Sequence, residues 1–511
     1  MNTTARLPGE VAVIGRGAST RRLVLACGLA LLSGCASDPS LLPHEKMPTE
    51  QQISARLQLQ PQDPALAAQP STTWWSAYND PELTRWIETA LTDSPTLHEA
   101  GARLARAQAV FAATHAAELP TLGASADSTA QRISGTGIFP PPLAGLVGTI
   151  NNVDIFTSLE LDLFGRLAAR TRSARQSAEA SAADRQLAGI RLAGAITHAY
   201  FDLARAQRER QIAVEIESSR NQTLDLVRRR VSAGFDTQVE RRLAEVTVPE
   251  IRVDIERADE QIALARHTIA VLAGQGPQAA DSLDAHLPQD AAIVPPQTLP
   301  LDLLARRADV AAAKNRVLAA MSSVQAAQAD FYPNINLTAL FGINSLTTQA
   351  LFEWNSRTWQ IGPAIHLPIF EGGALRAHLR SASADADAAI DAYNETVLQA
   401  AREVADTLSS IASVKRQIEQ QTLATEHAQA ASDLAAIRYG AGLGNYLTVL
   451  TAQAGVLVQR RAEVDLAARA AALDVSLALA LGGGFRDMPP APEPPAGAQG
   501  NDTRLTSSIE R

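Results

Sequence analysis

The stretch that decides the fold is RVSAGF at residues 230–235, because it recurs 208 positions later as RYGAGL at residues 438–443. A second correspondence, at a shift of 213 positions, places Pro95 on Ala308, Arg103 on Arg316 and Pro120 on Pro333. The matches follow the same order in both halves, and the difference between the two shifts is absorbed in one loop. Such self-similarity at a fixed spacing predicts an internal structural repeat.

The duplication sets the predicted division of the chain. An export signal is expected at residues 1–34, the first copy with its N-terminal segment and linker at 35–300, the second copy at 301–484, and a Pro- and Gly-rich flexible tail at 485–511.

Within each copy the hydrophobic period is helical, then strand-like, then helical again. Proline or glycine turns separate the segments. The helical stretches are residues 97–118, about 166–230, 237–273, about 374–439 and 446–481. Each of the two longest helices would extend about 100 Å at 1.5 Å per residue. Pro249 is expected to kink the first return helix.

Between the short and the long helix of each copy, apolar and polar residues alternate, as in strands with two different faces. The clearest run has on its apolar face Val153, Ile155, Thr157, Leu159, Leu161 and Leu163, and on its polar face Asp154, Ser158, Glu160 and Asp162. The other runs cover residues 122–129, 335–343 and 361–369. Each is about 10 residues long, the length of a tilted transmembrane strand, although strands of a soluble sheet alternate in the same way.

Four strands cannot close a barrel, and an open sheet edge in lipid would leave backbone groups unpaired. Two chains would supply eight strands, whose interior fills with side chains. Three chains would supply twelve strands and begin to leave a channel. We therefore expect a homotrimer that shares one twelve-stranded β-barrel.

The N-terminus has the pattern of a secretory signal. Basic residues precede the apolar stretch 23–32, which runs into Leu32, Ser33, Gly34 and Cys35. Small residues before a cysteine resemble a bacterial lipobox, so we expect cleavage before Cys35 and a covalent lipid on it. An ordinary signal peptide with a chance cysteine is the alternative. Because Cys27 lies in the removed segment, no disulfide within the mature chain is expected.

Composition excludes several function classes. Aromatic residues make up only 4% of the chain, as is typical of long helices and coiled coils. The net charge of −9 argues against nucleic-acid binding. The nine histidines lack metal-site spacing, and neither a phosphate-binding glycine loop nor a nucleophile elbow occurs. We therefore expect no enzymatic activity, no metal and no cofactor besides the lipid.

Several stretches of this sequence, in this order, resemble the TolC-like outer-membrane channels, specifically the lipoprotein branch (OprM or NodT type) that serves resistance-nodulation-division pumps. They are WWSAYNDPEL at 74–83, LPLDLLARR at 299–307, FYP at 331–333, FEGG at 370–373 and NYLTVL at 445–450. The resemblance covers about 74–484. One departure is Ala308, where the family usually has proline.

The resemblance implies a mostly α-helical protein, with a long periplasmic α-barrel continuous with a trimeric outer-membrane β-barrel. Residues 48–80, 274–300 and the tail would form a belt around the α-barrel. The implied function is passive: an exit duct for drugs or other small molecules. Its implied partners are a periplasmic adaptor, an inner-membrane pump and outer-membrane lipid.

The resemblance also implies a gate beside the two hairpin turns. Tyr439 matches the family's tyrosine and Glu240 its acidic position, with Arg230 or Arg438 as neighbours in contact. Thr448 and Thr451 stand where relatives often have aspartate. The alternative is that Tyr439 and Glu240 only cap and solvate the hairpin ends.

Gly234 and Gly442 are expected to adopt positive φ in the turns. An arginine cluster surrounds the first turn. We expect it to be a solvated helix face. The alternatives are that it pairs with Glu240 and Glu245 or docks an acidic surface of a partner. The members of the cluster are Arg228, Arg229, Arg230, Arg241 and Arg242.

Other functions are compatible with parts of the pattern. A protein-secretion channel of the type I systems would have the same fold. A periplasmic adaptor lipoprotein would have one helical hairpin rather than a duplicated pair, and a structural coiled coil would have no reason to carry four alternating strands.

Overall fold

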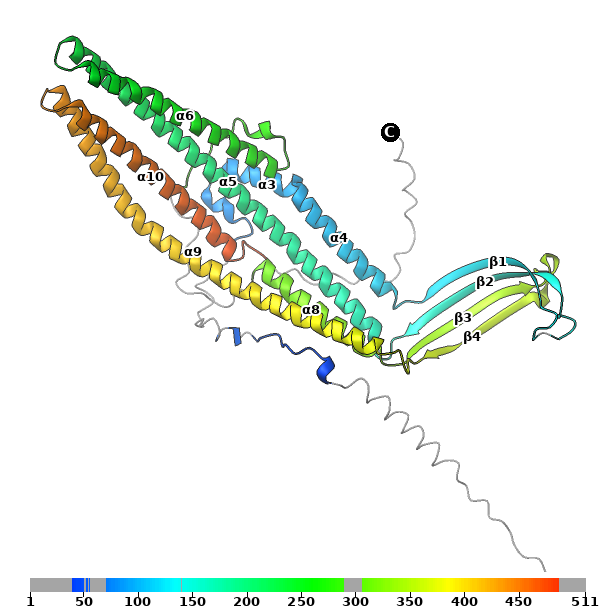
Figure 1. Cartoon of the computed structure of the whole chain (residues 1–511). Helices are drawn as coiled ribbons and strands as arrows, with labels where there is room; N and C mark the ends of the chain where they lie inside the picture. Colours follow the sequence, from blue (N-terminus) through cyan, green and yellow to red (C-terminus); the bar gives the residue numbers. More distant parts are fainter. Residues whose placement is uncertain are drawn as a thin grey trace, which may run out of the picture. The chain divides into compact units, whose positions relative to one another are not determined.

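The computed structural model of the chain describes residues 39–49, 52, 53, 55, 70–138, 140–288 and 306–486. One series of elements occurs twice: a short helix, two strands, a long helix and a return helix (Figure 1). The first series is α4 (Pro95–Ala116), β1 (Thr121–Arg132), β2 (Val147–Leu161), α5 (Arg166–Ser232) and α6 (Gln238–Leu272). The second is α8 (Ala308–Ala329), β3 (Asn334–Ser345), β4 (Arg357–His366), α9 (Ala374–Gly440) and α10 (Tyr446–Ala480).

Corresponding helices of the two series have equal lengths. The short helices α4 and α8 have 22 residues each, the long helices α5 and α9 have 67, and the return helices α6 and α10 have 35. Their starts differ by 213 for the short pair and by 208 for the other pairs, as the sequence comparison predicts. The predicted helices are therefore confirmed to within two residues at almost every end.

The four strands form one antiparallel sheet in the order β1-β2-β3-β4. Ile155 on β2 lies opposite Ala124 on β1 and Phe341 on β3, so all three side chains share a face. That face carries the apolar set, whereas Asp154 and Ser158 project from the other. Among the described residues, β1 and β4 each pair along one side only, which leaves two open edges.

Several strand boundaries differ from the predicted ones. β2 begins at Val147 rather than near Val153, because its first six residues pair with the second half of β1. Asn151, only 5% exposed, accepts a hydrogen bond from Ser128 of β1 (2.8 Å) and donates one to the carbonyl of Ser345.

At the other end, β2 stops at Leu161, so Asp162 and Leu163 lie beyond the sheet rather than on its two faces. The Asp162 carboxylate instead accepts a hydrogen bond from the backbone N–H of Ala168 (2.8 Å). Ala168 lies in the first turn of α5, where the backbone N–H groups have no partner within the helix. In the same way β4 ends at His366, short of the predicted Ile369.

The chain divides into two compact units, and the first contains the sheet and the adjoining ends of α4, α5, α8 and α9. The arm at residues 39–46 also belongs to it. Leu41 is buried against α8 and α9, and its carbonyl accepts from the Ser383 hydroxyl (2.6 Å). The Asp387 carboxylate accepts from the backbone N–H groups of His44 and Glu45. The arm is thus fixed by both apolar and polar contacts.

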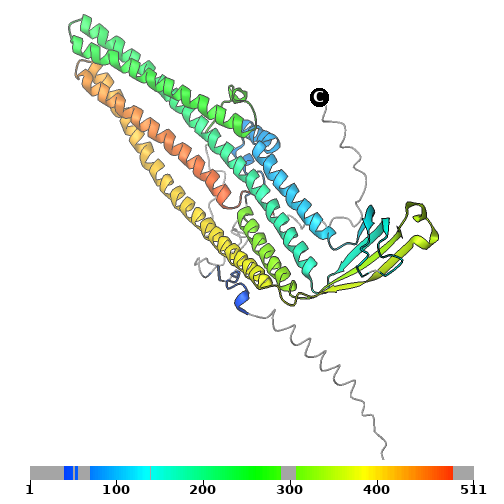
Figure 2. The same cartoon turned by 45° about the vertical axis from the view of Figure 1, so that its right-hand side comes forward.

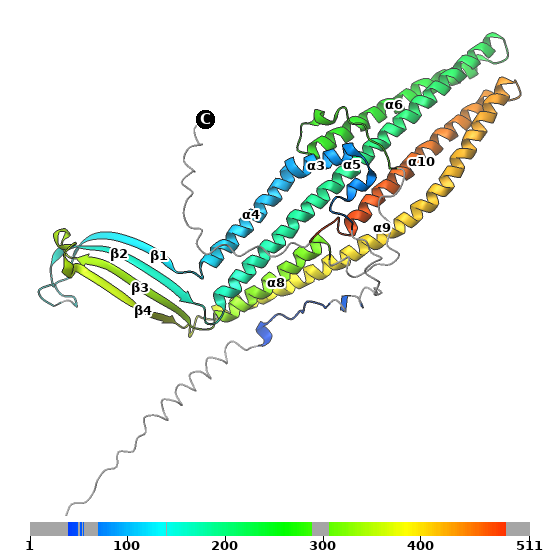
Figure 3. The same ribbon diagram turned by 180° about the vertical axis from the view of Figure 1, so that it is seen from behind.

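The second unit contains two helical hairpins, in which α5 lies beside α6 and α9 beside α10 in every view (Figures 2 and 3). Its largest core joins α5 to α3 (Pro81–Asp93) and includes Trp74, Trp86, Tyr200 and Leu283. Trp74 and Leu283 come from the segments expected to form a belt, so the described parts of those segments pack on one core.

The return helix α6 continues through Pro249. Proline lacks the N–H that would bond to the carbonyl four residues earlier, so α6 loses one backbone hydrogen bond there. Arg220 of α5 supplies a nearby contact, because its guanidinium donates to the carbonyl of Thr247. No described helix is both long and apolar enough to span a bilayer.

Candidate functional site

Both hairpin turns are built on a glycine in the left-handed region. Gly234 has φ of +75° and Gly442 of +76°, which confirms the predicted positive φ. In the first turn the N–H of Phe235 donates to the carbonyl of Arg230 (2.9 Å), and in the second Leu443 donates to Arg438 (2.8 Å). These bonds satisfy the last carbonyls of the long helices and reverse the chain within a few residues.

The helices that follow the turns have side-chain caps. At the start of α6 the Thr237 hydroxyl accepts from the N–H of Val239 (3.1 Å), and the Glu240 carboxylate accepts from the N–H of Thr237 (2.9 Å). This reciprocal pair is a capping box. At the start of α10 the Asn445 side chain accepts from the N–H and the hydroxyl of Thr448.

Glu240 is therefore engaged in its own helix start. Its hydrogen bonds with Thr237 lower the pKa of the carboxyl, which favours the charged form. The geometry matches the alternative in which Glu240 caps the hairpin, because its carboxylate accepts hydrogen bonds from the backbone N–H and the hydroxyl of Thr237.

Tyr439 contacts a different carboxylate, that of Asp236. Tyr439 is 1% exposed at the end of α9, and its hydroxyl donates to Asp236 in the turn of the other hairpin. Arg230 of α5 donates to the same carboxylate (2.8 Å) and to the backbone carbonyl of Tyr439 (3.1 Å). Its guanidinium also lies 4.6 Å from the centre of the Tyr439 ring. We name these three residues, Arg230, Asp236 and Tyr439, the latch.

The charges of the latch stabilise one another. The hydrogen bond from Arg230 holds the pKa of Asp236 below its ordinary value, and the bond from Tyr439 acts in the same direction. Burial, together with the Asp236 carboxylate, raises the pKa of Tyr439 far above its usual range. The tyrosine is thus a permanent donor and the aspartate a permanent acceptor at neutral pH.

An apolar cluster beneath the latch takes residues from both long helices, α5 and α9, and both return helices, α6 and α10. Its members are Leu224, Val227, Ala244, Val248, Ala435, Tyr439, Tyr446 and Val449. The rings of Tyr439 and Tyr446 are 5.9 Å apart. The cluster and the latch together join the first hairpin to the second near their ends, so any motion that separates the hairpins must break both.

Four other arginines at the turns contact nearby groups of their own hairpin. Arg438 donates to the carbonyl of Leu443 in its own turn (3.4 Å). Arg241 and Arg242 both pair with Glu245, one of the two glutamates expected in that alternative, and Arg228 lies 3.5 Å from Asp225. Of the predicted gate residues the structure thus brings together Arg230 and Tyr439. The sequence analysis missed Asp236, although it lies only two residues past Gly234.

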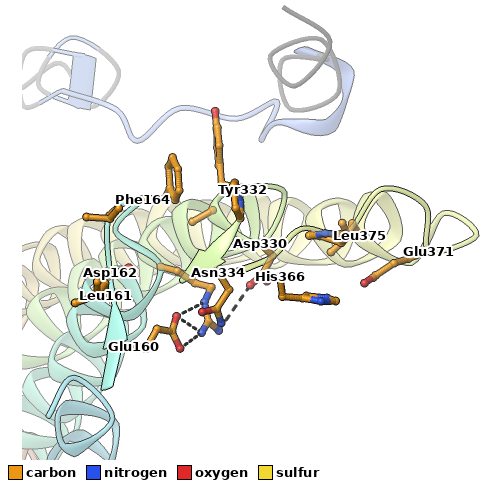
Figure 4. Close-up of a pocket in the computed structure, with 15 residues that line it drawn as sticks. Glu160, Leu161, Asp162, Phe164, Asp330, Tyr332, Asn334, His366, Glu371 and Leu375 are labelled. Atoms are coloured by element: carbon orange, nitrogen blue, oxygen red, sulfur yellow. Dashed lines mark hydrogen bonds and ion pairs between the residues drawn. The ribbon is translucent and has the colours of Figure 1, made fainter. Parts of the chain in front are cut away.

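A second polar cluster lies where the strands meet the helices of the first unit (Figure 4). Arg166, the first residue of α5, donates to both carboxylate oxygens of Glu160 at the end of β2, and Asp330 lies 3.9 Å away. Arg170 and His378 also approach Asp330. Glu160, Arg166 and Asp330 border a cavity of about 200 Å³.

This second cluster fits a structural role. Glu160 and Asp330 are mostly buried, and each has an arginine partner that offsets its negative charge at the strand-to-helix junction. Among the described residues, no group of three or more His, Cys, Asp or Glu side chains has the geometry of a metal site.

Comparison with known proteins gives consistent matches. The sequence model of the family described as "Outer membrane efflux protein" matches residues 86–275 and again residues 299–483. The fusaric acid resistance protein FusA of Burkholderia cepacia is 36% identical over 366 residues, which are 71% of this chain and 68% of that protein. The outer membrane protein OprJ of Pseudomonas aeruginosa is 31% identical over 421 residues, 82% of this chain and 88% of OprJ.

The solved structure of the outer membrane protein VceC of Vibrio cholerae has the same fold. It superposes with a TM-score of 0.77 at 33% identity, covering 82% of this chain and all of VceC.

Proposed function

The chain belongs to the outer membrane efflux protein family, and from this premise we propose that it is the exit duct of a tripartite efflux system. It is an outer-membrane channel protein with an α-barrel and a β-barrel part, like the relatives whose fold it shares. The assembly that we propose is a homotrimer, which receives solutes from an inner-membrane pump of the resistance-nodulation-division type through a periplasmic adaptor. Conduction would be passive, without catalysis by this chain.

The observation that supports the trimer best is the two-faced sheet with its open edges. One face is apolar, as lipid requires, and the other carries Asp154, Ser158 and Glu160, as a water-filled lumen requires. The unpaired edges of β1 and β4 would cost several kcal/mol per backbone group in a bilayer, so each must find another chain. Three chains give the smallest closed barrel that leaves a channel.

Two alternative functions, a periplasmic adaptor and a type I protein-secretion channel, agree with these findings to different degrees. The adaptor alternative is inconsistent with the family to which the chain belongs. A type I protein-secretion channel would share the fold, but the name of a relative, the fusaric acid resistance protein FusA, favours a small-molecule cargo. The genes beside this one would distinguish an efflux channel from a protein-secretion channel, if they encode an adaptor and a pump.

The latch is the proposed gate. Because Tyr439 and Asp236 lie on different hairpins, their hydrogen bond holds the two hairpin ends together within one chain. Arg230 contributes by fixing the Asp236 carboxylate and the last turn of α9. Such polar contacts are stable yet reversible, as a gate requires. Glu240 and Arg438 would act indirectly, by shaping the two turns.

Reconstitution tests the duct directly. The purified protein is expected to need detergent, to have the mass of three chains, and to form ion-conducting channels in planar bilayers. The closed latch predicts small conductance in the unmodified protein. A monomer that remains in solution without detergent would contradict the proposed membrane-embedded trimeric channel.

We propose further that Cys35 is acylated and holds the N-terminus at the membrane, although it lies outside the described residues. The fixed arm gives independent support. Cys35 lies six residues before Leu41, so the lipid would be attached within about 20 Å of the point where Leu41 is buried on α8 and α9. Several acyl chains at about 0.8 kcal/mol per buried CH₂ would anchor it firmly.

Replacing this cysteine tests the anchor. The variant Cys35→Ser is expected to abolish acylation while the trimer still requires detergent, because the barrel is itself embedded. The measurement is mass spectrometry of the mature N-terminus. Cys27→Ser is the matched control and should leave acylation intact, since Cys27 lies in the removed segment. An unmodified Cys35 in the native protein would end the lipoprotein proposal.

A further inference from the structure

The two edge strands of the sheet each carry an arginine at the end remote from the helices. Arg132 is the last residue of β1, and Arg357 is the first residue of β4. Arg132 lies opposite Val147 of β2 and Arg357 lies opposite Ile343 of β3, so both arginines project from the apolar face. Figure 1 shows β1 and β4 as the outer strands of the sheet, with the connecting loops at that end. The two arginines therefore lie where the apolar face meets the loops.

Charge is scarce in this part of the chain. Residues 128–152 and 343–361 include both loops, and their charged side chains are Arg132, Arg357 and Glu353 alone. Both arginines are exposed, and neither has an ion-pair partner among the described residues. Several large apolar side chains of these two stretches are exposed as well: Ile138, Val147, Phe352 and Trp359. An apolar surface thus ends in two cations whose counter-charge this chain does not supply.

The guanidinium of Arg357 is held in a defined position. Its central carbon lies 3.3 Å from the centre of the Trp354 ring, as in a cation–π contact. The loop before it is braced by two hydrogen bonds, in which the Ser356 hydroxyl donates to the carbonyl of Ala350 (2.6 Å) and the Ser345 hydroxyl donates to that of Thr347 (2.8 Å). An aromatic ring covers only a flat face of a guanidinium, so the N–H groups at its edge remain available to bind an anion.

The spacing along the strands places both arginines at one edge of the bilayer. On the apolar face of β1, Leu122 and Arg132 are ten residues apart, which is about 33 Å along the strand. At a tilt of about 40° this length covers about 25 Å of the barrel axis, the height of the apolar band of an outer-membrane barrel. Arg357 similarly lies eight residues from Ile365, near the other end of β4. Arginine at this level extends its charged group to the lipid headgroups, and tryptophan is enriched there.

We propose that Arg132 of one subunit and Arg357 of the next together bind a phosphorylated lipid headgroup of the outer leaflet. The proposal rests on the proposed trimer, in which the free edge of β4 pairs with the free edge of β1 of a neighbouring subunit. We call this junction of β4 and β1 the seam. The helices of this outer-membrane protein lie on the periplasmic side, so the arginine end of each seam faces outward.

Electrostatics at the seam favours an anion between the two arginines. Like charges on neighbouring strands destabilise a sheet, so Arg132 and Arg357 would repel each other if nothing lay between them. A phosphate group accepts two parallel N–H donors from each guanidinium and so neutralises both. The acyl chains of the same lipid would lie along the exposed apolar side chains below, such as Trp359. A free phosphate ion would gain only the first of these two contributions.

The experiment is native mass spectrometry of the detergent-purified trimer after mixing with lipid A, a lipid with two phosphate groups, or with its dephosphorylated form. The trimer is expected to retain three molecules of lipid A, one for each seam, and to release the dephosphorylated form. Arg132→Gln and Arg357→Gln should each weaken retention about tenfold, because each removes one charged partner of the same phosphate. Trp354→Leu, which keeps the charge but removes the ring, should weaken it less than Arg357→Gln does.

The matched control is Arg252→Gln. Arg252 is an equally charged, exposed arginine, but it lies on α6 in the other compact unit of the chain. This variant should retain lipid A as the unmodified trimer does. If an arginine variant of the seam does not form a trimer, Trp354→Leu and the comparison of the two lipid forms decide the question, because neither removes a charge from the protein.

Four results would overturn the inference. The first is unchanged retention in Arg132→Gln or Arg357→Gln, and the second is equal retention of the dephosphorylated lipid. The third is six bound molecules, half of them lost in each variant, which would show two separate sites rather than one shared seam. The fourth is displacement of the lipid by millimolar inorganic phosphate, which would assign the site to the free ion. An unmodified protein that forms no trimer would instead contradict the proposed function.

Discussion

Replacing Ile155 by arginine is expected to destabilise the membrane-embedded protein by about 2–4 kcal/mol per chain, the cost of an arginine near the middle of a bilayer. Ile155 lies in the central part of β2, its side chain is on the apolar face, and the residue is 52% exposed. Its neighbours across the strands are Ala124 and Phe341, neither of which can pair with a charge. The measurement is the amount of assembled trimer in the outer membrane, with its resistance to urea.

The matched control is Ser158→Arg, three residues away on the same strand and on the polar face. There the guanidinium would enter water and cost little. Equal loss of trimer in the two variants would show that the two faces have been exchanged, or that the sheet lies outside the bilayer. Ile155 is a sharper position for this test than Leu161, because β2 ends at Leu161 and a charge there would reach the interface easily.

Removing the latch is expected to open the channel. Hydrogen bonds to a charged group contribute about 1.5–3 kcal/mol each when buried, and less where water competes as it does near a hairpin end. The combination of Asp236→Asn with Tyr439→Phe removes the charge and the hydroxyl but keeps the shapes. We expect conductance in planar bilayers to rise several-fold and cells to become permeable to large antibiotics.

Glu240→Gln distinguishes closure by the latch from the gate expected from the sequence, in which Glu240 takes part. Glutamine also serves at this position of a capping box, so α6 should keep its start and the channel should stay closed. If Glu240→Gln opens the channel as much as the latch variant does, the carboxylate of Glu240 takes part in closure and the latch is incomplete. Unchanged conductance in the latch variant would return Tyr439 to a purely structural role.

The latch also has a definite pH dependence. A carboxyl whose pKa is lowered in the closed form contributes its stabilisation above the ordinary aspartate pKa of about 4, and loses it as the pH falls through the lowered value. The Asp236 carboxyl, held low by Arg230, should therefore keep the channel closed between about pH 5 and 8. Acid-induced opening should appear only below about pH 4, and Asp236→Asn should abolish it.

The helices and their turns could be predicted from the sequence because each signal is local. A change of hydrophobic period marks where a helix gives way to a strand, and Gly234 and Gly442 mark where the chain must reverse. The duplication doubles this information, since a boundary seen in one copy can be transferred to the other. The gate could not be predicted from such local signals, because Asp236 and Tyr439 are brought together only by packing of the two hairpins.

The remaining differences also come from tertiary structure. The first residues of β2 have no clear alternation, and they become a strand because β1 and Ser345 of β3 supply partners on both sides. Phe156 and Ile150 interrupt the polar face of β2, and sequence periodicity has no account of them. The Phe156 ring occupies the space that a side chain at Gly123 of the neighbouring strand would need, and only the register identifies that neighbour.

The contacts of the latch all lie within one chain, and this has a consequence for leakage. In the proposed trimer each subunit would carry its own lock, so the fully open state requires three separate releases. If one lock is released with a given probability and the locks act independently, complete opening occurs with the cube of that probability. A modest bond in each subunit thus becomes a tight seal for the cell, while release of a single subunit would admit only a partial, transient current.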